Sequence, residues 1–437
     1  MMGADAQGPV GASSGWPAPV DLSDLLPGQT NGVVTMGLER VKGALNALGN
    51  PHNSFAAIQV AGTNGKGSIC SLLHGALTAH GLRCGLYTSP HLVSWCERIR
   101  VGQGFIAPAT LRNLLLELRS LAQQWSLTPF EQLTVAAFLH FHRQAVDLAV
   151  LEVGLGGRLD ATTAHCRRST VAFASIGEDH QEYLGADLAS IAREKSGVLS
   201  PGCVAFSGPQ PAAVVAVLRQ AAAACGAAIT WVPPLAEDQF QALNLPLRGR
   251  VQRDNAAVAM AVLEHVSATL HPLEMQRSRK GMGSVCWPGR LQHCQWQGQP
   301  LLLDGAHNRS AALSLRQHLD DKASGGSIHW VLGILANKDA IGMLRALLRP
   351  GDRAWLVAIV DSSCWSADQL VRQLPEPQAA CLQLAPPHLR PTWPVAVALG
   401  QAFQRPPGSE ACVVVSGSLY LLGQLHHQGV IQVVEQN

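Results

Sequence analysis

The chain has 437 residues, with 32 Lys and Arg against 30 Asp and Glu, so its formal net charge is only +2. This near balance argues against a general nucleic-acid or anionic-membrane binder, because such proteins need a basic patch. Hydrophobic residues make up 47% of the chain, which excludes long disorder. The length is sufficient for roughly two or three domains, each with a core of its own.

The uncharged stretch 196–218 is long enough to span a bilayer, but its composition argues against a membrane helix. It contains Pro201, Pro209 and Pro211, which would break such a helix. No charged segment followed by an apolar run occurs at the N-terminus, so no secretory signal is expected. The eleven cysteines are scattered without a CxxC pair, which is typical of reduced thiols. We therefore expect a cytoplasmic protein without membrane partners.

In chain order, residues 1–20 are rich in Gly, Ala, Ser and Pro and are expected to form a flexible extension. Apolar residues at helical spacing then predict a helix over residues 36–48. A domain boundary is expected near 288–300, where Trp287-Pro288-Gly289 ends a helical region and a Gln-rich run follows. The chain therefore divides into a long first part and a shorter second part.

Short apolar strands alternate with longer helical stretches along most of the chain. Such alternation is typical of parallel sheets in an α/β fold. The predicted strands cover residues 56–60, 148–151, 170–174, 301–303, 330–332, 354–359 and 412–415. We therefore predict two α/β domains that meet at a cleft, which is a common place for a ligand site.

A glycine-rich loop, Gly62-Thr63-Asn64-Gly65-Lys66-Gly67-Ser68, lies between the first predicted strand and a predicted helix. Phosphate binding needs backbone N–H groups that can point inward, a helix N-terminus, a lysine and a hydroxyl for Mg²⁺. The loop offers all four, although its spacing departs from the standard P-loop. An ordinary glycine-rich turn is the alternative, and the strand–loop–helix context favours the phosphate site.

Acidic residues follow the ends of two further predicted strands. Glu152 comes directly after strand 148–151, and Glu178-Asp179-His180 follows strand 170–174. The carboxyl ends of parallel strands are where α/β sheets bind ligands, and Mg²⁺ prefers carboxylate oxygens together with phosphates. Glu152 is therefore a candidate magnesium ligand. His180 is a second candidate because its strand is expected to neighbour that of Glu152, and a structural or solvated histidine is the alternative.

Eight motifs in order resemble the folylpolyglutamate synthase family, whose members in many bacteria also act as dihydrofolate synthases. The family belongs with the Mur ligases, and the similarity runs from about residue 32 to residue 420. The motifs are the glycine-rich loop, Thr88-Ser89-Pro90-His91-Leu92, Leu127-Thr128-Pro129-Phe130-Glu131, residues 152–160, Asp179-His180, residues 193–197, Pro288-Gly289-Arg290 and Asp304-Gly305-Ala306-His307-Asn308. The resemblance implies an N-terminal P-loop-type ATPase domain with a parallel sheet over residues 21–290, which would also bind folate. A smaller C-terminal Rossmann-like α/β domain, the glutamate-ligase domain, would cover residues 291–437.

The resemblance implies an ATP-dependent ligase that adds L-glutamate to dihydropteroate, to (tetrahydro)folate polyglutamates or to both. The substrate carboxyl would be phosphorylated by ATP, and the glutamate amine would then displace phosphate from the acyl phosphate. Lys66 would act on the β- and γ-phosphates as a catalytic residue. By the family pattern, the ATP-binding residues are Thr63, Asn64, Gly65, Lys66, Gly67, Ser68, Asn255, Arg290 and Asp304.

The same resemblance implies the metal and substrate residues. Ser89, Glu152 and His180 would hold one Mg²⁺. Lys195 is expected to be carbamylated, which turns its cation into a carboxylate that can help to bind a second Mg²⁺; a solvated helix face is the alternative for the Arg193-Glu194-Lys195 triplet. The folate pocket would be lined by Thr128, Pro129, Phe130, Glu131, Leu159, Asp160 and Ala161. His307 is expected to be structural or to face the nucleotide, and it is also a candidate catalytic residue.

Two other functions stay open. A Mur-type cell-wall ligase would share the ATP chemistry but bind a UDP-sugar peptide, and the strings at residues 88–92 and 154–160 favour folate. A non-catalytic ATP-binding protein would lack some of the residues that bind magnesium or phosphate, and none of these is missing. We expect a monomer that binds small molecules and no nucleic acid. Ser416-Gly417-Ser418 resembles the family's Gly-Ser pair near the C-terminus, but a plain tight turn is an equal interpretation. The same holds for Asn337-Lys338-Asp339.

Overall fold

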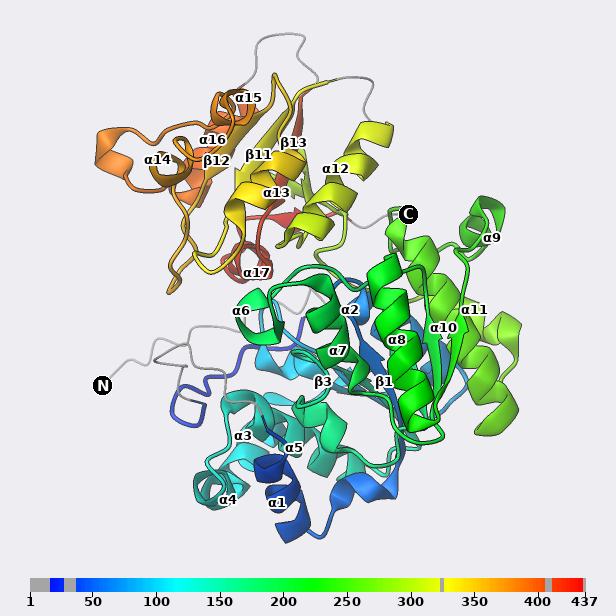
Figure 1. The fold of residues 1–437 in the computed structure, drawn as a ribbon. Coiled ribbons are helices and arrows are strands. Elements are labelled where there is room, and N and C mark those ends of the chain that lie inside the picture. The colour runs from blue at the N-terminus through cyan, green and yellow to red at the C-terminus, as the bar shows by residue number, and fades with distance from the viewer. Residues whose placement is uncertain (1–15, 27–36, 323–325, 405–410, 435–437) are drawn as a thin grey trace, which may run out of the picture.

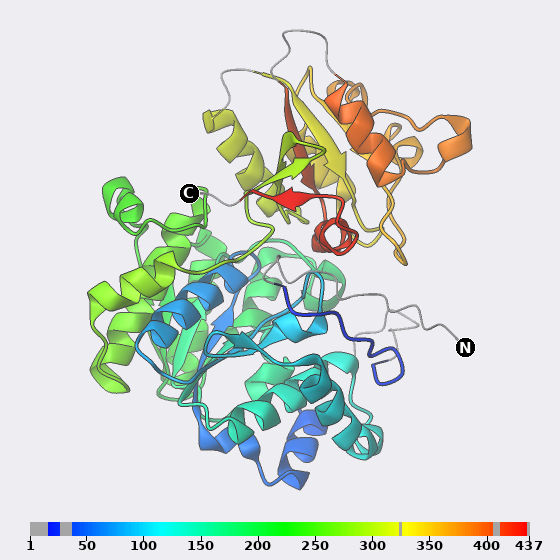
Figure 2. The same cartoon turned by 180° about the vertical axis from the view of Figure 1, so that it is seen from behind.

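The structure is a computed structural model that describes residues 16–26, 37–322, 326–404 and 411–434. Its strands form two separate sheets, each covered by helices. In Figure 1 the first unit, coloured blue to green, lies below the second unit, coloured yellow to red. Figure 2 shows from behind that the red helix α17 (Leu419–His427) lies at the seam between the two units.

The first sheet has eight strands in the order β4-β3-β2-β5-β1-β6-β7-β8. Their bounds are β1 (Ala56–Ala61), β2 (Cys84–Tyr87), β3 (Ile99–Val101), β4 (Gly104–Phe105), β5 (Leu148–Glu152), β6 (Thr170–Phe173), β7 (Val204–Ser207) and β8 (Ala228–Trp231). All neighbours from β2 to β8 pair in parallel, whereas β3 and β4 are antiparallel additions. The predicted parallel sheet is therefore confirmed from β2 to β8, and the antiparallel edge was not predicted; the short link between β3 and β4 allows only a hairpin.

Helices cover both faces of this sheet. Ile58 and Val60 of β1 point to the face covered by α2 (Lys66–Ala79), α10 (Val251–Thr269) and α11 (Met275–Gly283). Ala57 and Ala61 point to the opposite face, covered by α1 (Glu39–Ala47), α3 (Pro108–Glu117), α5 (Pro129–Arg143), α7 (Leu188–Ser196) and α8 (Ala212–Cys225). Short helices α4 (Arg119–Gln124), α6 (Gln181–Leu184) and α9 (Glu237–Ala242) lie in the connections. Burial on both faces explains why the strands read as continuous apolar runs.

The second sheet has the order β12-β11-β13-β10-β9-β14. Its strands are β9 (Gln292–Trp296), β10 (Gln299–Leu303), β11 (Ile328–Leu332), β12 (Arg353–Leu356), β13 (Cys412–Ser416) and β14 (Gln432–Val433). The central strands are parallel, but β9 and β14 are antiparallel, so this sheet is also mixed. The strand predicted over residues 354–359 ends early, at Leu356, because its partner β11 ends at Leu332.

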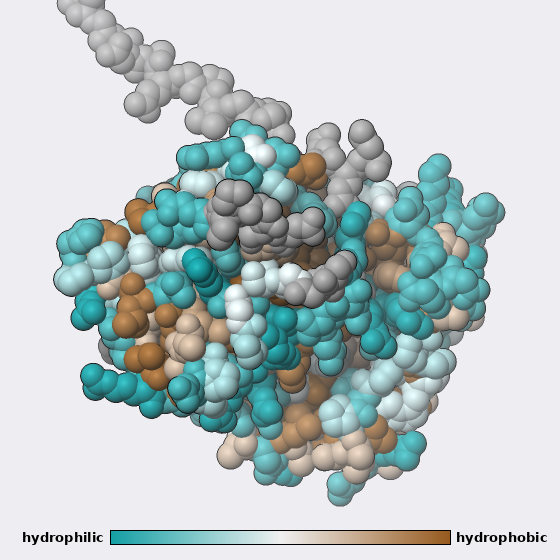
Figure 3. Space-filling view, turned by 90° about the horizontal axis from the view of Figure 1, so that it is seen from above, coloured by the Kyte–Doolittle hydropathy of each residue, from teal (hydrophilic) through white to brown (hydrophobic). Residues whose placement is uncertain are grey.

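Helices again cover both faces. The helices are α12 (Arg309–Lys322) and α13 (Ala340–Leu347) on one face, α16 (Val395–Phe403) and α17 on the other, and the short α14 (Ala367–Leu370) and α15 (Glu376–Ala379) in a connection. Seen from above, the described surface is mostly hydrophilic, with hydrophobic residues in patches between the hydrophilic ones (Figure 3). Among the helices that the structure describes, none has the length and apolar character needed to cross a membrane.

Part of the expected N-terminal extension packs on the folded units. The Trp16 ring centroid lies 5.2 Å from that of His426 on α17, and Ser94 Oγ donates a hydrogen bond to the Ala18 carbonyl oxygen. Leu22, two residues beyond the expected extension, is buried. Residues 1–15 of the extension lie outside the described residues. The segment that begins at Trp16 therefore contacts both units, since Ser94 belongs to the first and His426 to the second.

Candidate active site at the seam

Loops that follow strands of the first sheet meet loops that follow strands of the second. The loop after β1 contacts the turn after β10 through a hydrogen bond between Asn64 and Asn308. The loop after β6 contacts the turn after β11 through an ion pair between Asp179 and Lys338. The carboxyl ends of the parallel strands of both sheets therefore face the seam, where α/β folds bind ligands.

The glycine-rich loop over residues 62–68, called the phosphate loop below, is anchored by hydrogen bonds at its start and has backbone N–H groups available at its end. The backbone N–H groups of Thr63 and Asn64 donate to the Ser175 carbonyl oxygen at 2.7 and 3.1 Å. The Thr63 hydroxyl donates to the Gly177 carbonyl oxygen at 3.0 Å. Two expected phosphate donors are thus engaged within the protein. The N–H groups available to phosphate are those at the N-terminus of α2, which begins at Lys66.

Gly65 has a conformation and surroundings that no other residue would fit. Its φ is +95°, which L side chains rarely adopt. A Cβ atom here would lie 2.5 Å from Asn255 Oδ1, so only glycine lets this asparagine of α10 reach the loop. Asn255 is buried, and its Nδ2 donates to Gln252 Oε1 at 2.9 Å. The asparagine is therefore held in a fixed position against the loop.

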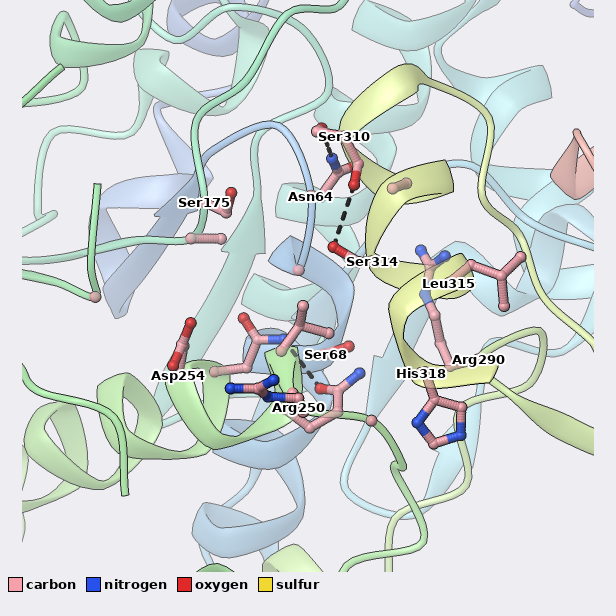
Figure 4. A pocket seen from close by; sticks show the side chains of 18 of the residues that line it. Asn64, Ser68, Ser175, Arg250, Asp254, Arg290, Ser310, Ser314, Leu315 and His318 are labelled. Carbon is pink, nitrogen blue, oxygen red and sulfur yellow. Dashed lines mark hydrogen bonds between the residues drawn. The ribbon is translucent and has the colours of Figure 1, made fainter. Parts of the chain in front are cut away.

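A cavity at the seam brings together most of the expected ATP residues. It encloses about 200 Å³, and both units line it. The expected residues among its lining are Asn64, Gly65, Ser68, Asn255, Arg290 and Asp304. Figure 4 shows Asn64 and Ser68 on one side, with Ser310, Ser314 and His318 of α12 facing them from the second unit. Thr63, Lys66 and Gly67 are not part of this lining.

Asp304 shapes the side of the cavity formed by the second unit. Its carboxylate accepts the backbone N–H groups of Leu291 and Ala306 at 3.0 and 2.9 Å. Burial raises the pKa of this carboxyl, while the charge of Arg290 and these hydrogen bonds oppose the rise. Asp304 therefore holds the segment that carries Arg290 against the turn after β10.

Two buried polar groups beside the phosphate loop fit a magnesium ion with phosphates. Ser68 Oγ is buried, and none of the described residues is its hydrogen-bond partner. Such unpaired buried hydroxyls are uncommon, and hydroxyl oxygens are suitable ligands for Mg²⁺. Glu152 is only 5% exposed and accepts the Ser89 backbone N–H at 3.2 Å. Burial raises its pKa, and the nearby charges of Lys66 and Arg290 oppose that rise.

His180 lies on the other side of the phosphate loop from Glu152. The strands that carry them are not neighbours, contrary to expectation, because β1 lies between β5 and β6. Burial, together with Lys338 and Lys66 and despite Asp179, lowers the pKa of His180 to about 4. Its ring is therefore neutral at pH 7, the form that binds metals. Within the described residues, no three His, Cys, Asp or Glu side chains form a metal cluster by themselves. Magnesium binding by Ser89, Glu152 and His180 thus stays a prediction.

Lys195 is not on a solvated helix face. It is 5% exposed, and its Nζ donates to the Gly62 carbonyl oxygen of the phosphate loop at 2.8 Å. Burial and the charge of Lys66 lower the pKa of Lys195 to about 7, although Asp179 and Asp160 act in the opposite direction. Much of this amine is therefore neutral and nucleophilic near pH 7, whereas an ordinary lysine is almost fully protonated.

One group of expected folate residues forms the start of α5. Thr128 Oγ1 accepts the Glu131 N–H at 3.3 Å, and Glu131 Oε2 accepts the Thr128 N–H at 2.7 Å, which is a capping box. Glu131 also pairs with Arg40 of α1 at 2.7 Å and is buried. Phe130 packs on Gly154, where a Cβ atom would lie 2.6 Å from its ring. Of these residues, Thr128, Pro129 and Phe130 are partly exposed and able to contact a ligand.

The other group lies in the loop after Glu152. Asp160 accepts hydrogen bonds from the N–H groups of Gly154 and Leu155, both at 2.9 Å, and from the N–H and hydroxyl of Thr162. Both carboxylate oxygens are thus occupied by the loop itself. Leu159 is partly exposed, whereas Asp160 and Ala161 are buried. Asp160 therefore determines the shape of the loop, and a direct substrate contact by Leu159 stays a prediction.

His307 forms a cluster at the seam with Asp179 and Lys338, neither of which was predicted as a site residue. His307 does not line the nucleotide cavity. Its Nδ1 lies 2.8 Å from the Gly305 carbonyl oxygen, and its Nε2 lies 3.6 Å from Asp179 Oδ2. Burial would raise the pKa of Asp179, but His307 and Lys338 hold it well below the usual range. Asp179 and Lys338 both lie in motifs that the sequence shows, but 159 positions separate them, so no local pattern predicts that they form a pair.

Comparisons with known proteins identify the family of this chain. Residues 290–428 match the model of a family described as "Dihydrofolate synthetase, C-terminal domain". The chain is 30% identical to the dihydrofolate synthetase of Saccharomyces cerevisiae over 421 residues, which is 90% of this chain and 97% of the yeast protein. It resembles Escherichia coli FolC solved with DHPP and ADP, with a TM-score of 0.80, 29% identity and coverage of 93% of this chain and 96% of the other. It also resembles a bifunctional folylpolyglutamate synthase/dihydrofolate synthase solved with Mn, AMPPNP and L-glutamate, with a TM-score of 0.77, 32% identity and coverage of 91% and 95%. The chain belongs to the dihydrofolate synthase/folylpolyglutamate synthase family of ATP-dependent ligases.

Proposed function

We propose that this chain joins L-glutamate to dihydropteroate, to (tetrahydro)folate polyglutamates or to both through an acyl phosphate. The observation that carries this proposal is the cavity at the seam, which combines the phosphate loop with Arg290 and Asp304. A ligase of this kind must bring a phosphorylated acid and an amine together, and a site between two units allows each unit to present one of them. The relatives solved with ADP and DHPP, or with AMPPNP and L-glutamate, support the assignment.

The chain's own residues supply charge and position. Lys66 and the N-terminus of α2 would neutralise the charge that spreads over the transferred phosphoryl group. Magnesium, held by phosphate oxygens and by Ser68, Ser89, Glu152 and His180, would add further neutralisation. Phe130 and Leu159 would contact the pterin-bearing substrate. His307 would act from the second unit as a further catalytic residue.

Competing acceptors test the function directly. Incorporation of labelled L-glutamate would be measured with dihydropteroate and with tetrahydrofolate in one reaction. We expect dihydropteroate to be used, because both the matched family model and the yeast relative carry the name dihydrofolate synthetase. Incorporation with neither acceptor would contradict the proposal, and ADP release with UDP-muramoyl substrates would favour the cell-wall alternative. ATP binding without any ligation would favour a non-catalytic protein.

We further propose that Lys195 is carbamylated and helps to bind a second Mg²⁺. Its burial beside Gly62 and its lowered pKa support this, since carbon dioxide reacts with a neutral amine. Lys195→Ala should lose most activity, and a short carboxylate added to the solution should restore part of it. Unchanged turnover in this variant would contradict the proposal. Mass spectrometry of the intact protein, with and without bicarbonate, provides a reading independent of turnover.

Residues 21–290 and 291–437 are proposed as the two functional domains of a cytoplasmic monomer. The matched family model begins at residue 290, close to the proposed boundary. The expectation of a cytoplasmic protein rests on the scattered cysteines, which form no CxxC pair. Light scattering during gel filtration tests the oligomeric state, and a mass twice that of one chain would contradict a monomer. Proteolysis with sequencing of the stable fragments tests the boundary.

A further inference from the structure

One buried carboxylate, that of Asp179, accepts hydrogen bonds from the neighbouring residue His180 and from two distant segments of the chain. Its side chain is 9% exposed. Oδ1 lies 2.6 Å from Lys338 Nζ and 2.9 Å from the His180 backbone nitrogen, and both groups donate hydrogen bonds to it. Oδ2 accepts a hydrogen bond from Asn308 Nδ2 at 3.0 Å. Because Lys338 and Asn308 belong to the second unit, this carboxylate joins the two units.

Asn308 extends the contact to the phosphate loop. Its side-chain amide pairs reciprocally with that of Asn64, with hydrogen bonds of 3.0 and 3.1 Å. Asn308 Oδ1 also accepts the Ala311 N–H at 2.9 Å, which caps the start of α12. Asn64 Nδ2 donates to Ser310 Oγ at 2.7 Å, as Figure 4 shows. The phosphate loop is therefore held against the N-terminus of α12.

Lys338 is held in position by its own unit. Its carbonyl oxygen accepts the Trp365 indole N–H at 3.2 Å, and the next residue, Asp339, caps α13. The Lys338 side chain is 11% exposed, so both members of the pair with Asp179 are largely removed from water. Separating such a pair leaves two desolvated charges uncompensated unless water enters. The pair therefore favours the arrangement in which the units are in contact.

We propose that Asp179 is a positioning residue that closes the second unit onto the phosphate loop and orients His307 for the reaction. His307 lies between the Gly305 carbonyl oxygen, 2.8 Å from Nδ1, and Asp179 Oδ2, 3.6 Å from Nε2. His180 has a φ of +52°, which is uncommon for a residue with a side chain, and Asp179 accepts its N–H. One carboxylate thus fixes a histidine on each side of the seam.

Substitutions at both ends of the ion pair test the proposal. Asp179→Asn keeps the side-chain shape and removes the charge that holds Lys338, and Lys338→Met removes the other charge. In each variant we expect kcat/KM for glutamate to fall about tenfold, within the usual range of coupling between sites. Hydrogen–deuterium exchange should become faster in peptides covering residues 62–68 and 305–312. Lys338→Arg keeps the positive charge and should retain part of the kcat/KM and part of the protection from exchange. The kinetic measurement depends on the proposed ligase function, whereas the exchange measurement does not.

A double variant and a matched control make the outcome decisive. D179N/K338M should lose no more than the more impaired single variant, because both changes remove the same contact. Asp320→Asn, which breaks the 2.7 Å ion pair with Arg316 inside the second unit, should leave exchange at residues 62–68 unchanged. Additive losses in the double variant, or unchanged exchange at the seam in the folded single variants, would overturn the proposal. If melting curves show that Asp179→Asn is unfolded, Lys338→Met and Lys338→Arg decide the question.

Discussion

Asp160 and Asp179 are both buried aspartates within family motifs, but their partners differ in origin. The donors to Asp160 come from Gly154, Leu155 and Thr162, all within six positions along the chain. Two of the donors to Asp179 come from Asn308 and Lys338 of the second unit. Burial and a place within a family motif are therefore not enough to identify a functional carboxylate. A carboxylate with local donors shapes its own loop, and one with distant donors couples parts of the active site.

The largest expected effect on turnover comes from substitution of Glu152, a third buried carboxylate. Among the described residues, it has fewer hydrogen-bond donors than Asp160 or Asp179. Glu152→Gln removes the charge beside Lys66 but retains an oxygen for the Ser89 N–H. We expect turnover to fall at least about 100-fold, since the loss of even an indirect metal-site partner costs 10–100-fold. The melting temperature should not fall, because burial already disfavours this charge. ADP release, together with Mn²⁺ binding measured by electron paramagnetic resonance, checks both parts. Near-normal turnover would remove Glu152 from the metal site.

Asp160→Asn should show the opposite behaviour, with a large effect on stability and a smaller one on turnover. The amide nitrogen of asparagine cannot accept hydrogen bonds, so the donors to one of the two oxygens lose their partner. Leaving buried donors unpaired costs about 1–3 kcal/mol each, so we expect a loss of at least about 2 kcal/mol. Urea unfolding measures this change. A stable variant with abolished turnover would place Asp160 among the groups that contact substrate.

The proposed carbamate on Lys195 would make activity depend on both pH and carbon dioxide. Because its pKa is lowered to about 7, the neutral amine that forms the carbamate predominates above that pH and is lost as the pH falls through it. Enzyme stripped of carbon dioxide should lose about tenfold in rate, the scale of a lost metal-site partner. Bicarbonate should restore more of the rate at about pH 8 than at about pH 6. Equal recovery at both values would show that the carbamate is not required.

Arg40→Met should have the smallest effect. Glu131 lies between the two cases, because it has a local donor in Thr128 and a distant one in Arg40. The capping box remains in this variant, and the Arg40 side chain is 22% exposed, so water can replace part of the lost contact. We expect a loss of about 1 kcal/mol in the free energy of unfolding and little change in turnover. A loss as large as that of Asp160→Asn would show that the distant partner dominates even here.

Local patterns predicted the elements around the phosphate loop well. The loop was placed between a strand and a helix, and the structure has β1 ending at Ala61 and α2 beginning at Lys66. The strand that ends in Glu152 was also correctly placed. The edge strands β3 and β4 were not predicted, because three and two residues are too few to show a strand pattern. The position of β1 between the strands that carry Glu152 and His180 was not predicted either, because strand order depends on tertiary packing rather than on local sequence.

The environment of Lys195 shows a second limit of local patterns. The triplet Arg193-Glu194-Lys195 is equally compatible with a solvated helix face. In the structure Arg193 is exposed, but Lys195 is buried against Gly62, which lies 133 positions away. Its lowered pKa follows from that burial and from Lys66. Such a shift depends on neighbours that only the folded chain supplies.

The family, the ATP-dependent chemistry and the prediction of a phosphate site could be obtained from the sequence alone, because these depend on residues close together along the chain. Glycines, a lysine and a hydroxyl between a strand and a helix favour a phosphate site at Gly62 to Ser68 over an ordinary glycine-rich turn, although their spacing departs from the standard P-loop. The tertiary structure alone decided which motif residues hold loops, as Asp160 does, and which join the units, as Asp179 does. The reason is physical, since the role of a buried charge depends on the groups that compensate it. For Asp179 those groups lie at Asn308 and Lys338, far along the chain and close only after folding.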